Sequence, residues 1–333
     1  MAISLKKAHK ILQMEKILIT GAAGQLGSEL TQSLADFYGG EAVIATDLYK
    51  AESHKFENCR FETLDVMDQE GVARLIKKER ITQVYHLAAI LSAAGEKKPF
   101  YAWRTNMDSL LYILEIAKEH TLEKVFWPSS IAVFGSNSPK INTPQHCIMD
   151  PDTVYGISKL AGERWCAYYF EKYQVDVRSL RYPGLIGYKT LPGGGTTDYA
   201  VDIYHKAMAG ENFECFLSEN TFLPMMYMPD AIKATIDLML APKENIKIRS
   251  SYNLGGMSLS PKTIYESIKE HSPSFKITYR PDFRQQIADS WPNSIDDAVA
   301  KSEWGWQPDF DLKSMTADII KNLPLLISNY KKI

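Results

Sequence analysis

The stretch GAAGQLG at residues 21–27 constrains the fold more than any other part of this sequence. It follows a short apolar run, ILIT at 17–20, that is typical of a buried strand. It precedes a segment whose apolar residues are spaced by four and three: Leu26, Leu30, Leu34 and Phe37. That spacing predicts an amphipathic helix. Glycines between a strand and a helix allow a tight turn and a close approach to a pyrophosphate, so we expect a dinucleotide site here.

The same alternation of strands and helices continues along the chain. Further strands are expected at 42–46, 60–64, 82–89, 124–130 and 175–183, with helices between them. This order predicts an α/β, Rossmann-type doubly wound parallel sheet over residues 15–184, with parts of later segments. After residue 184 the elements are shorter and more mixed, so we expect residues 185–333 to form mainly a smaller α/β substrate-binding domain. Residues 1–14 form an N-terminal extension in this reading, and we expect residues 1–13 to be dispensable.

Composition excludes several functional classes. A formal net charge of −2 gives no reason to expect nucleic acid or an anionic membrane surface as a partner. No run of about 18 apolar residues is present, so no membrane-spanning helix is expected. The four cysteines are widely spaced and form no CxxC pair, which disfavours a metal site or a disulfide framework and favours a cytoplasmic protein.

Asp47 follows the second expected strand, where a carboxylate accepts hydrogen bonds from the ribose hydroxyls of a bound adenosine. A 2′-phosphate would be repelled by this carboxylate, so the sequence favours NAD over NADP. Lys50 is the nearby residue that could soften this preference.

A second constellation follows the fifth expected strand. That strand ends at Ser129 and Ser130, and Tyr155 and Lys159 follow in the sequence YGISK. A spacing of four places the tyrosine and the lysine on one face of a helix. A neighbouring cation favours phenolate, so we expect Lys159 to lower the pKa of Tyr155 and make it a general base.

Several segments together resemble the extended short-chain dehydrogenase/reductase family: GAAGQLG, HLAA at 86–89, SSIAVFG at 129–135, YGISK at 155–159 and LRYPG at 180–184. The resemblance covers nearly the whole chain from about residue 15. It implies that a serine positions the reacting hydroxyl, that Tyr155 takes its proton, and that Lys159 holds the nicotinamide ribose. Ser130 is favoured over Ser129 as that serine, but both stay open.

The resemblance also implies a set of cofactor-binding residues. They are Gly21, Gly24, Gln25, Leu26, Gly27, Asp47, Asp65, Val66, His86, Leu87, Ala88, Ala89, Asn106, Tyr155, Lys159, Tyr182, Pro183, Gly184 and Leu185. Two of these also suit a structural role, since His86 fits a core histidine and Asn106 fits a structural helix residue.

A second glycine-rich stretch, LPGGGTTDYA at 191–200, helps to distinguish between the groups of enzymes within this family. Extended members of the family are mostly nucleotide-sugar epimerases and dehydratases, which carry an asparagine after the Arg–Tyr pair. Here Pro183 and Gly184 follow Arg181 and Tyr182. Residues 185–207, 221–239 and 284–297 are instead similar to the short-chain type of L-threonine 3-dehydrogenases. The glycine-rich stretch is therefore expected to form a wall of the substrate pocket.

This resemblance implies an NAD-dependent oxidation of L-threonine at its Cβ hydroxyl, with no metal and a small amino acid as substrate. The expected substrate-binding residues are Ser92, Ser129, Ser130, Tyr155, Thr196 and Thr197. A nucleotide-sugar epimerase or dehydratase is the alternative, supported by Arg280 and Arg284, and a redox-sensing NAD-binding regulator is a third reading. Relatives of this type pair as homodimers through four helices, for which residues 100–119 and 155–172 are the candidates.

Overall fold

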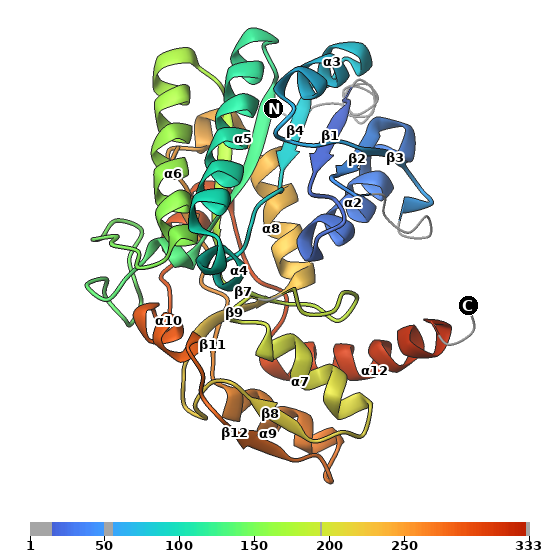
Figure 1. Ribbon diagram of the computed structural model, residues 1–333, viewed down its shortest axis with the longest axis vertical. Helices are drawn as coiled ribbons and strands as arrows, with labels where there is room; N and C mark the ends of the chain where they lie inside the picture. The colour runs from blue at the N-terminus through green and yellow to red at the C-terminus, as the bar shows by residue number, and fades with distance from the viewer. Residues whose placement is uncertain (1–14, 50–55, 194, 331–333) are drawn as a thin grey trace.

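The computed structural model describes residues 15–49, 56–193 and 195–330, with side chains as far as residue 326. The extension at residues 1–14 and Lys50 lie outside the described residues. A seven-stranded sheet with the order β10-β6-β5-β4-β1-β2-β3 forms the upper part of the molecule in Figure 1. Its strands are β1 (Ile17–Thr20), β2 (Val43–Asp47), β3 (Arg60–Thr63), β4 (Gln83–His86), β5 (Lys124–Ser130), β6 (Val177–Tyr182) and β10 (Tyr252–Asn253).

Every pairing in this sheet is parallel, and β1 lies at its centre. Ile17 is opposite Val43 of β2 on one side and Gln83 of β4 on the other. The chain first adds strands on the β2 side and then crosses to β4, so the strand order reverses between β1 and β4. This arrangement confirms the predicted doubly wound parallel sheet, and a reversal point of this kind is where such sheets bind ligands.

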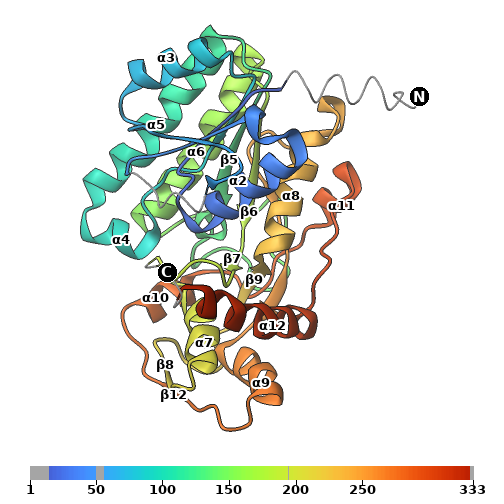
Figure 2. The same cartoon turned by 90° about the vertical axis from the view of Figure 1, so that its right-hand side faces the viewer.

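Helices cover both faces of the sheet (Figure 2). One face carries α3 (Gln69–Glu79), α5 (Pro99–Glu119) and α6 (Val154–Tyr173), and the other carries α2 (Gln25–Tyr38), α8 (Met228–Leu240) and α11 (Ala298–Trp304). Successive side chains of β1 alternate between the two cores, with Leu18 on the α5 side and Ile17 and Ile19 on the α2 side. Burial on both faces explains why the strand is apolar throughout.

Segments after residue 184 complete this sheet. The edge strand β10 pairs with β6, with Tyr252 opposite Leu180, and α8 packs beside α2. The helix face expected from the sequence is correct at Leu30 and Leu34, which are fully buried. It is wrong at Phe37, which is 45% exposed near the end of α2, where its ring packs edge-on against Tyr38.

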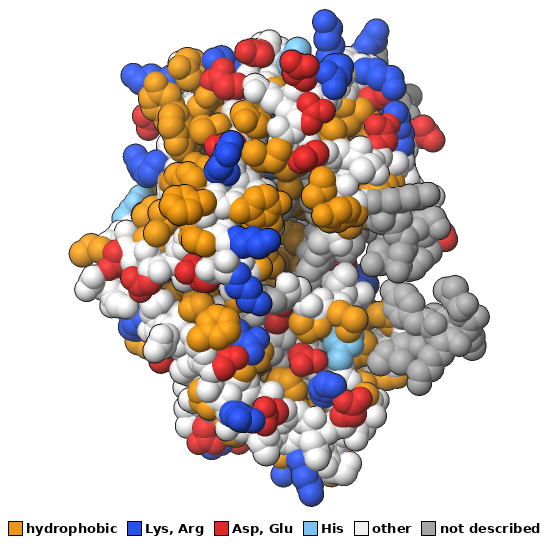
Figure 3. Space-filling view, viewed as in Figure 1, with side chains coloured by type: hydrophobic (Ala, Val, Ile, Leu, Met, Phe, Trp, Pro, Cys, Tyr) orange, Lys and Arg blue, Asp and Glu red, His pale blue; other side chains and the backbone are white. Residues whose placement is uncertain are grey.

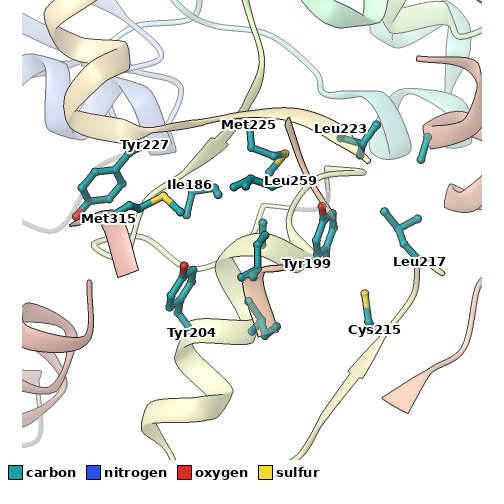
Figure 4. Close-up of a cluster of buried hydrophobic side chains, with 14 of the residues drawn as sticks. Ile186, Tyr199, Tyr204, Cys215, Leu217, Leu223, Met225, Tyr227, Leu259 and Met315 are labelled. Carbon is teal, nitrogen blue, oxygen red and sulfur yellow. The ribbon is translucent and has the colours of Figure 1, made fainter. Parts of the chain in front are cut away.

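The lower part of Figure 1 is a mixed group of smaller elements. Its strands are β7 (Gly184–Ile186), β9 (Leu223–Tyr227) and β11 (Met257–Leu259) in one sheet, and β8 (Phe213–Cys215) and β12 (Ile277–Tyr279) in another. Its helices are α7 (Tyr199–Met208), α9 (Pro261–His271), α10 (Arg284–Ser290) and α12 (Leu312–Tyr330). Figure 4 shows their shared core, in which Tyr199 and Tyr204 of α7 lie below Met225 and Leu259.

Short elements connect these parts. They are α4 (Ser92–Lys97) and the 3-10 turns Gly40–Ala42, Ile131–Val133 and Lys243–Asn245. Over the part of the chain that the structure describes, no helix combines the length and the apolar character needed to cross a bilayer.

Candidate functional site

A cavity of about 530 Å³ lies at the carboxyl ends of the parallel strands, at the reversal point between β1 and β4. Its wall includes the glycine turn after β1, Asp47 at the end of β2, and Tyr155 and Lys159 of α6. Thr196 and Trp291 from the lower group of elements form the opposite wall. The volume lies within the range typical of small-molecule and cofactor sites.

The glycine turn packs so tightly that side chains would not fit. Gly21 has a φ of +72°, and a Cβ there would lie 2.6 Å from the backbone nitrogen of Ala88. A Cβ on Gly27 would lie 2.2 Å from the carbonyl oxygen of Gly21. Helix α2 begins after Gly24, and no side chain caps its first turn. Its first N–H groups therefore suit the pyrophosphate of a dinucleotide.

The carboxylate of Asp47 is fixed at the edge of this turn. Its Oδ2 accepts a hydrogen bond from the backbone N–H of Ala23 at 2.9 Å, and its Oδ1 accepts one from Leu48 at 2.7 Å. An ionised carboxylate has about four acceptor positions. Two remain for the ribose hydroxyls, so the residues present fit the adenosine half of a dinucleotide.

Helix α6 begins so that Tyr155 lies against the end of β5. The Thr153 hydroxyl caps the helix by accepting a hydrogen bond from Gly156 N at 3.0 Å. A Cβ on Gly156 would lie 2.1 Å from the carbonyl oxygen of Ala132, so only glycine allows the first turn to pack directly on the backbone after β5. The Tyr155 phenol thereby reaches the Ser130 hydroxyl, to which it is hydrogen-bonded.

The two adjacent serines face different partners. Ser129 is 2% exposed and donates a hydrogen bond to Oε1 of Glu163 at 2.6 Å. Ser130 accepts a hydrogen bond from Ala132 N at 3.2 Å and meets Tyr155. Both residues line the cavity, but only Ser130 has its hydroxyl beside the phenol.

Glu163 and Arg181 form a buried ion pair beneath these residues. Arg181 donates from Nε to Oε1 at 2.8 Å and from Nη2 to Oε2 at 2.7 Å. Its Nη1 donates to Oδ1 of Asn253 and to the carbonyl of Gln145, each at 3.0 Å. The network joins α6, β5, β6 and β10. Sequence reasoning missed it, although a charged residue inside the strand run VRSLRY was the available signal.

Burial dominates the protonation of Tyr155 and Lys159. It raises the pKa of Tyr155 to about 12, while the hydrogen bond with Ser130 lowers it. It lowers the pKa of Lys159 to about 7, against the opposing influence of Cys166 and Glu163. The expectation that Lys159 lowers the tyrosine pKa is not met here. The lysine Nζ donates to the carbonyl of Pro128 at 2.5 Å and lies 5.5 Å from the centre of the Tyr155 ring.

Two predicted cofactor-binding residues do not reach the cavity. His86 is 1% exposed, its ring nitrogens pair with Thr20 and Ser109 at 2.7 and 3.0 Å, and burial lowers its pKa to about 3. It is a neutral core histidine behind the wall. Asn106 also lies behind the wall, where its amide accepts from Ile90 N at 2.7 Å and donates to Ile90 O at 3.1 Å. It supports the wall by holding the segment after β4.

The cavity brings together all the other predicted residues. They are Gly21, Gly24, Gln25, Leu26, Gly27, Asp47, Asp65, Val66, Leu87, Ala88, Ala89, Ser92, Ser129, Ser130, Tyr155, Lys159, Tyr182, Pro183, Gly184, Leu185, Thr196 and Thr197. Tyr101 and Trp291 also line it and were not predicted. Trp291 lies in an irregular segment after α10, for which periodicity gives no signal.

Residues 195–198 of the second glycine stretch line the cavity. Thr196 is 1% exposed, and its hydroxyl lies 3.4 Å from the hydroxyl of Ser92. Asp198 is the N-cap residue of α7, and its Oδ2 accepts a hydrogen bond from Gly195 N at 2.8 Å. A Cβ on Gly184 would lie 2.7 Å from Cγ2 of Thr197 and 2.5 Å from Sδ of Met225. A side chain at residue 184 would therefore collide with this wall.

The two arginines that support the nucleotide-sugar alternative lie elsewhere. Neither lines the cavity. The Arg280 side chain is 81% exposed, at 4.0 Å from Glu214. The guanidinium of Arg284 lies over the ring of Phe216 and pairs with Asp282 at 2.6 Å.

Comparisons with known proteins agree on the family. Residues 17–255 match the NAD dependent epimerase/dehydratase family. An uncharacterized epimerase/dehydratase of Staphylococcus saprophyticus is 48% identical over 305 residues, which cover 91% of this chain and 95% of that protein. An L-threonine dehydrogenase of Cupriavidus necator in its holo form is 55% identical, with a TM-score of 0.91 over 92% of this chain and 99% of that one. An L-threonine dehydrogenase of Clostridium difficile is 48% identical, with a TM-score of 0.91 over 94% and 98% of the two chains.

The first prediction concerns Asp47. We expect Asp47→Ala to raise the use of NADP relative to NAD by about tenfold or more, because a repulsion of about 1.4 kcal/mol toward the 2′-phosphate is removed. The measurement is the ratio of kcat/KM for the two cofactors. Asp47→Asn is a second variant of similar size, which removes the charge and one of the two acceptors and can keep the hydrogen bond from Ala23 N. An unchanged ratio in both variants would remove Asp47 from the ribose site.

Proposed function

Because the chain belongs to the NAD dependent epimerase/dehydratase family, with NAD as its cofactor, we propose that it is an L-threonine 3-dehydrogenase. In this proposal it oxidises the Cβ hydroxyl of L-threonine and forms 2-amino-3-oxobutanoate. The observation that carries the proposal is the wall formed by the second glycine stretch. Thr197 fills the space beside Gly184 that a side chain would need, and both residues line the cavity that Tyr155 also lines.

The charges on the wall suit a small zwitterion. Among the described residues, the charged side chains that line the cavity are Asp47, Asp65, Lys159 and Asp198. Asp47 lies beside the glycine turn, whereas Asp198 lies beside Thr196 and Thr197. We therefore assign Asp198 to the substrate ammonium, and the hydroxyls of Ser92 and Thr196 to the polar groups around the Cα atom. A diphosphate would need cations at this end, and Arg280 and Arg284 lie away from it.

The chemistry follows from the three polar side chains at the end of β5 and the start of α6. Ser130 orients the substrate hydroxyl toward Tyr155, to which it is hydrogen-bonded. Tyr155, as phenolate, removes the hydroxyl proton while the Cβ hydride departs. Lys159 binds the nicotinamide ribose. Bound NAD supplies the hydride acceptor.

The same observations disfavour the two other readings. A nucleotide-sugar epimerase or dehydratase needs cationic partners for its diphosphate, and Arg280 and Arg284 do not line the cavity. A regulator that only senses NAD needs no proton acceptor, yet Ser130, Tyr155 and Lys159 face one cavity. The lower group of elements supplies the wall beside Gly184, so we propose that it acts as the substrate-binding domain.

Tyr155 should make the reaction depend on pH. Because burial raises the phenol pKa to about 12, the phenolate fraction grows with pH. We expect kcat/KM for threonine to rise by up to about tenfold per pH unit between pH 6 and 8. Tyr155→Phe should lower kcat by about 10²–10⁴-fold and flatten this profile, with NAD binding retained. A variant with near-native turnover would show that another group is the base.

Thr196 should set substrate affinity. Replacing it with valine leaves a buried polar partner unpaired, which costs about 1–3 kcal/mol. We expect Thr196→Val to raise the KM for threonine accordingly and to leave the KM for NAD little changed. Thr190→Val is the matched control, because Thr190 lies in the same segment outside the cavity wall. Steady-state NADH formation with threonine, UDP-glucose and UDP-galactose tests both the variant and the proposed function. Turnover of a sugar nucleotide and none of threonine would overturn it.

We further propose that the chain forms a homodimer through α5 and α6. Figure 3 shows hydrophobic side chains gathered over the region where these helices lie in Figure 1. The exposed aromatic residues of the two helices are Phe100, Tyr101, Trp103, Trp165, Tyr168 and Tyr173. A contiguous patch of large apolar side chains on a helix pair is typical of a protein interface.

Trp165 provides the test of this interface. Its side chain is 40% exposed on α6. We expect Trp165→Glu to convert the dimer to a monomer at micromolar concentration, because a carboxylate in an apolar interface loses its hydration. Light scattering after size exclusion measures the mass. Phe283→Glu, at an exposed aromatic residue outside α5 and α6, should leave the dimer intact. A wild-type protein of monomeric mass would contradict the proposal.

A further inference from the structure

A buried carboxylate links the helix of the glycine turn to the second glycine stretch. Glu29 lies one turn after Gln25 in α2, and its side chain is only 7% exposed. Its Oε2 pairs with Nζ of Lys189 at 3.2 Å. Lys189 belongs to the segment between β7 and α7, whose described residues 187–193 and 195–198 we call the wall loop. The same loop carries Thr196, Thr197 and Asp198 of the cavity wall.

Glu29 lies beneath the backbone of this loop. A Cβ on Gly187 would lie 3.3 Å from Oε1 of Glu29 and 3.4 Å from Cβ of Met228. A larger residue at 187 would therefore press on the carboxylate. The glycine allows the loop to cross directly over α2 and the start of α8.

The Glu29 carboxylate has fewer hydrogen-bond partners than a buried carboxylate usually has. Burial raises its pKa, and Lys189 opposes that effect through charge and a hydrogen bond. Within the described part of the chain, Oε1 has no hydrogen-bond partner. Lys189 is half exposed, so water screens the pair. A buried charge pair of this kind adds little net stability, whereas it can fix one arrangement against others.

We propose that the Glu29–Lys189 ion pair is a positioning device that anchors the wall loop to the cofactor helix and so sets the affinity for the amino-acid substrate. The inference rests on the proposed function for the identity of that substrate. The anchoring itself depends only on the loop and the helix. Both residues lie outside the cavity wall, so they act through Thr196 and Asp198.

Kinetics give the first test. We expect Glu29→Gln and Lys189→Met each to raise the KM for threonine threefold to tenfold by the loss of one charge pair, with kcat and the KM for NAD changed less than twofold. The double variant should be no worse than either single variant, because both remove the same interaction. Lys189→Arg keeps the positive charge, so its KM for threonine should equal that of the wild type. Lys206→Met, which removes the surface pair with Glu211 at the far end of α7, is the matched control and should change nothing.

Proteolysis gives a second test that needs no substrate. Trypsin cuts after lysine, and Lys189 is held by Glu29. We expect the fragments 1–189 and 190–333 to form at least threefold faster from Glu29→Gln than from the wild type, at an unchanged melting temperature. Equal cleavage rates of the wild type and Glu29→Gln would overturn the anchoring. An unchanged KM for threonine in the single variants, or a double variant whose KM increase is the product of the two single increases, would overturn the link to the substrate. Absence of threonine turnover in the wild type would overturn the proposed function alone, because cleavage still decides the anchoring.

Discussion

The buried pair of Glu163 and Arg181 is the interaction on which the site depends. It connects α6 to β5 through Ser129, to β6 through Arg181 itself, and to β10 through Asn253. Because Ser129 and Arg181 lie directly opposite each other in the sheet, the pair also fixes the rotation of α6 about its axis. Tyr155 and Lys159 lie two turns and one turn before Glu163. A buried ion pair whose hydrogen bonds are nearly all formed adds little to the net free energy of unfolding, but it favours one arrangement of the elements that it connects.

Two glycine stretches serve opposite purposes in this protein. The first removes side chains so that the turn can pack on backbone atoms, as the contacts of Gly21 with Ala88 and of Gly27 with Gly21 show. The second is followed by Thr196 and Thr197, which bring side chains into the cavity, and it requires a glycine at residue 184 of β7 for Thr197 to fit. The space beside residue 184 is therefore occupied by Thr197 and Met225, which come from segments far apart in the sequence.

Much of this architecture is readable from the sequence, for identifiable reasons. The strands are predictable because burial on both faces makes them continuously apolar, and the cofactor end is predictable because a glycine turn and Asp47 have fixed positions in such sheets. Long-range partners are not predictable in this way. Trp291 reaches the cavity from an irregular segment, β10 joins the sheet across a long separation, and His86 is withdrawn from it by Thr20 and Ser109. The pKa of Tyr155 also differs from expectation, because Lys159 turns toward Pro128 and burial prevails.

Burial moves Tyr155 and Lys159 toward their neutral forms from opposite directions, since it raises the pKa of the phenol and lowers that of the ammonium. Each would gain from the charge of the other, but the lysine is held by the carbonyl of Pro128 and lies 4.4 Å from the centre of the Trp127 ring. The remaining anionic influence on Lys159 includes Glu163, whose charge is shared with Arg181. Because Arg181 neutralises Glu163, the ion pair that orients α6 also weakens the effect of the Glu163 carboxylate on the pKa of Lys159. It follows that the phenolate form of Tyr155 is a minority state of the protein alone, and that its population depends on what else enters this low-dielectric cavity.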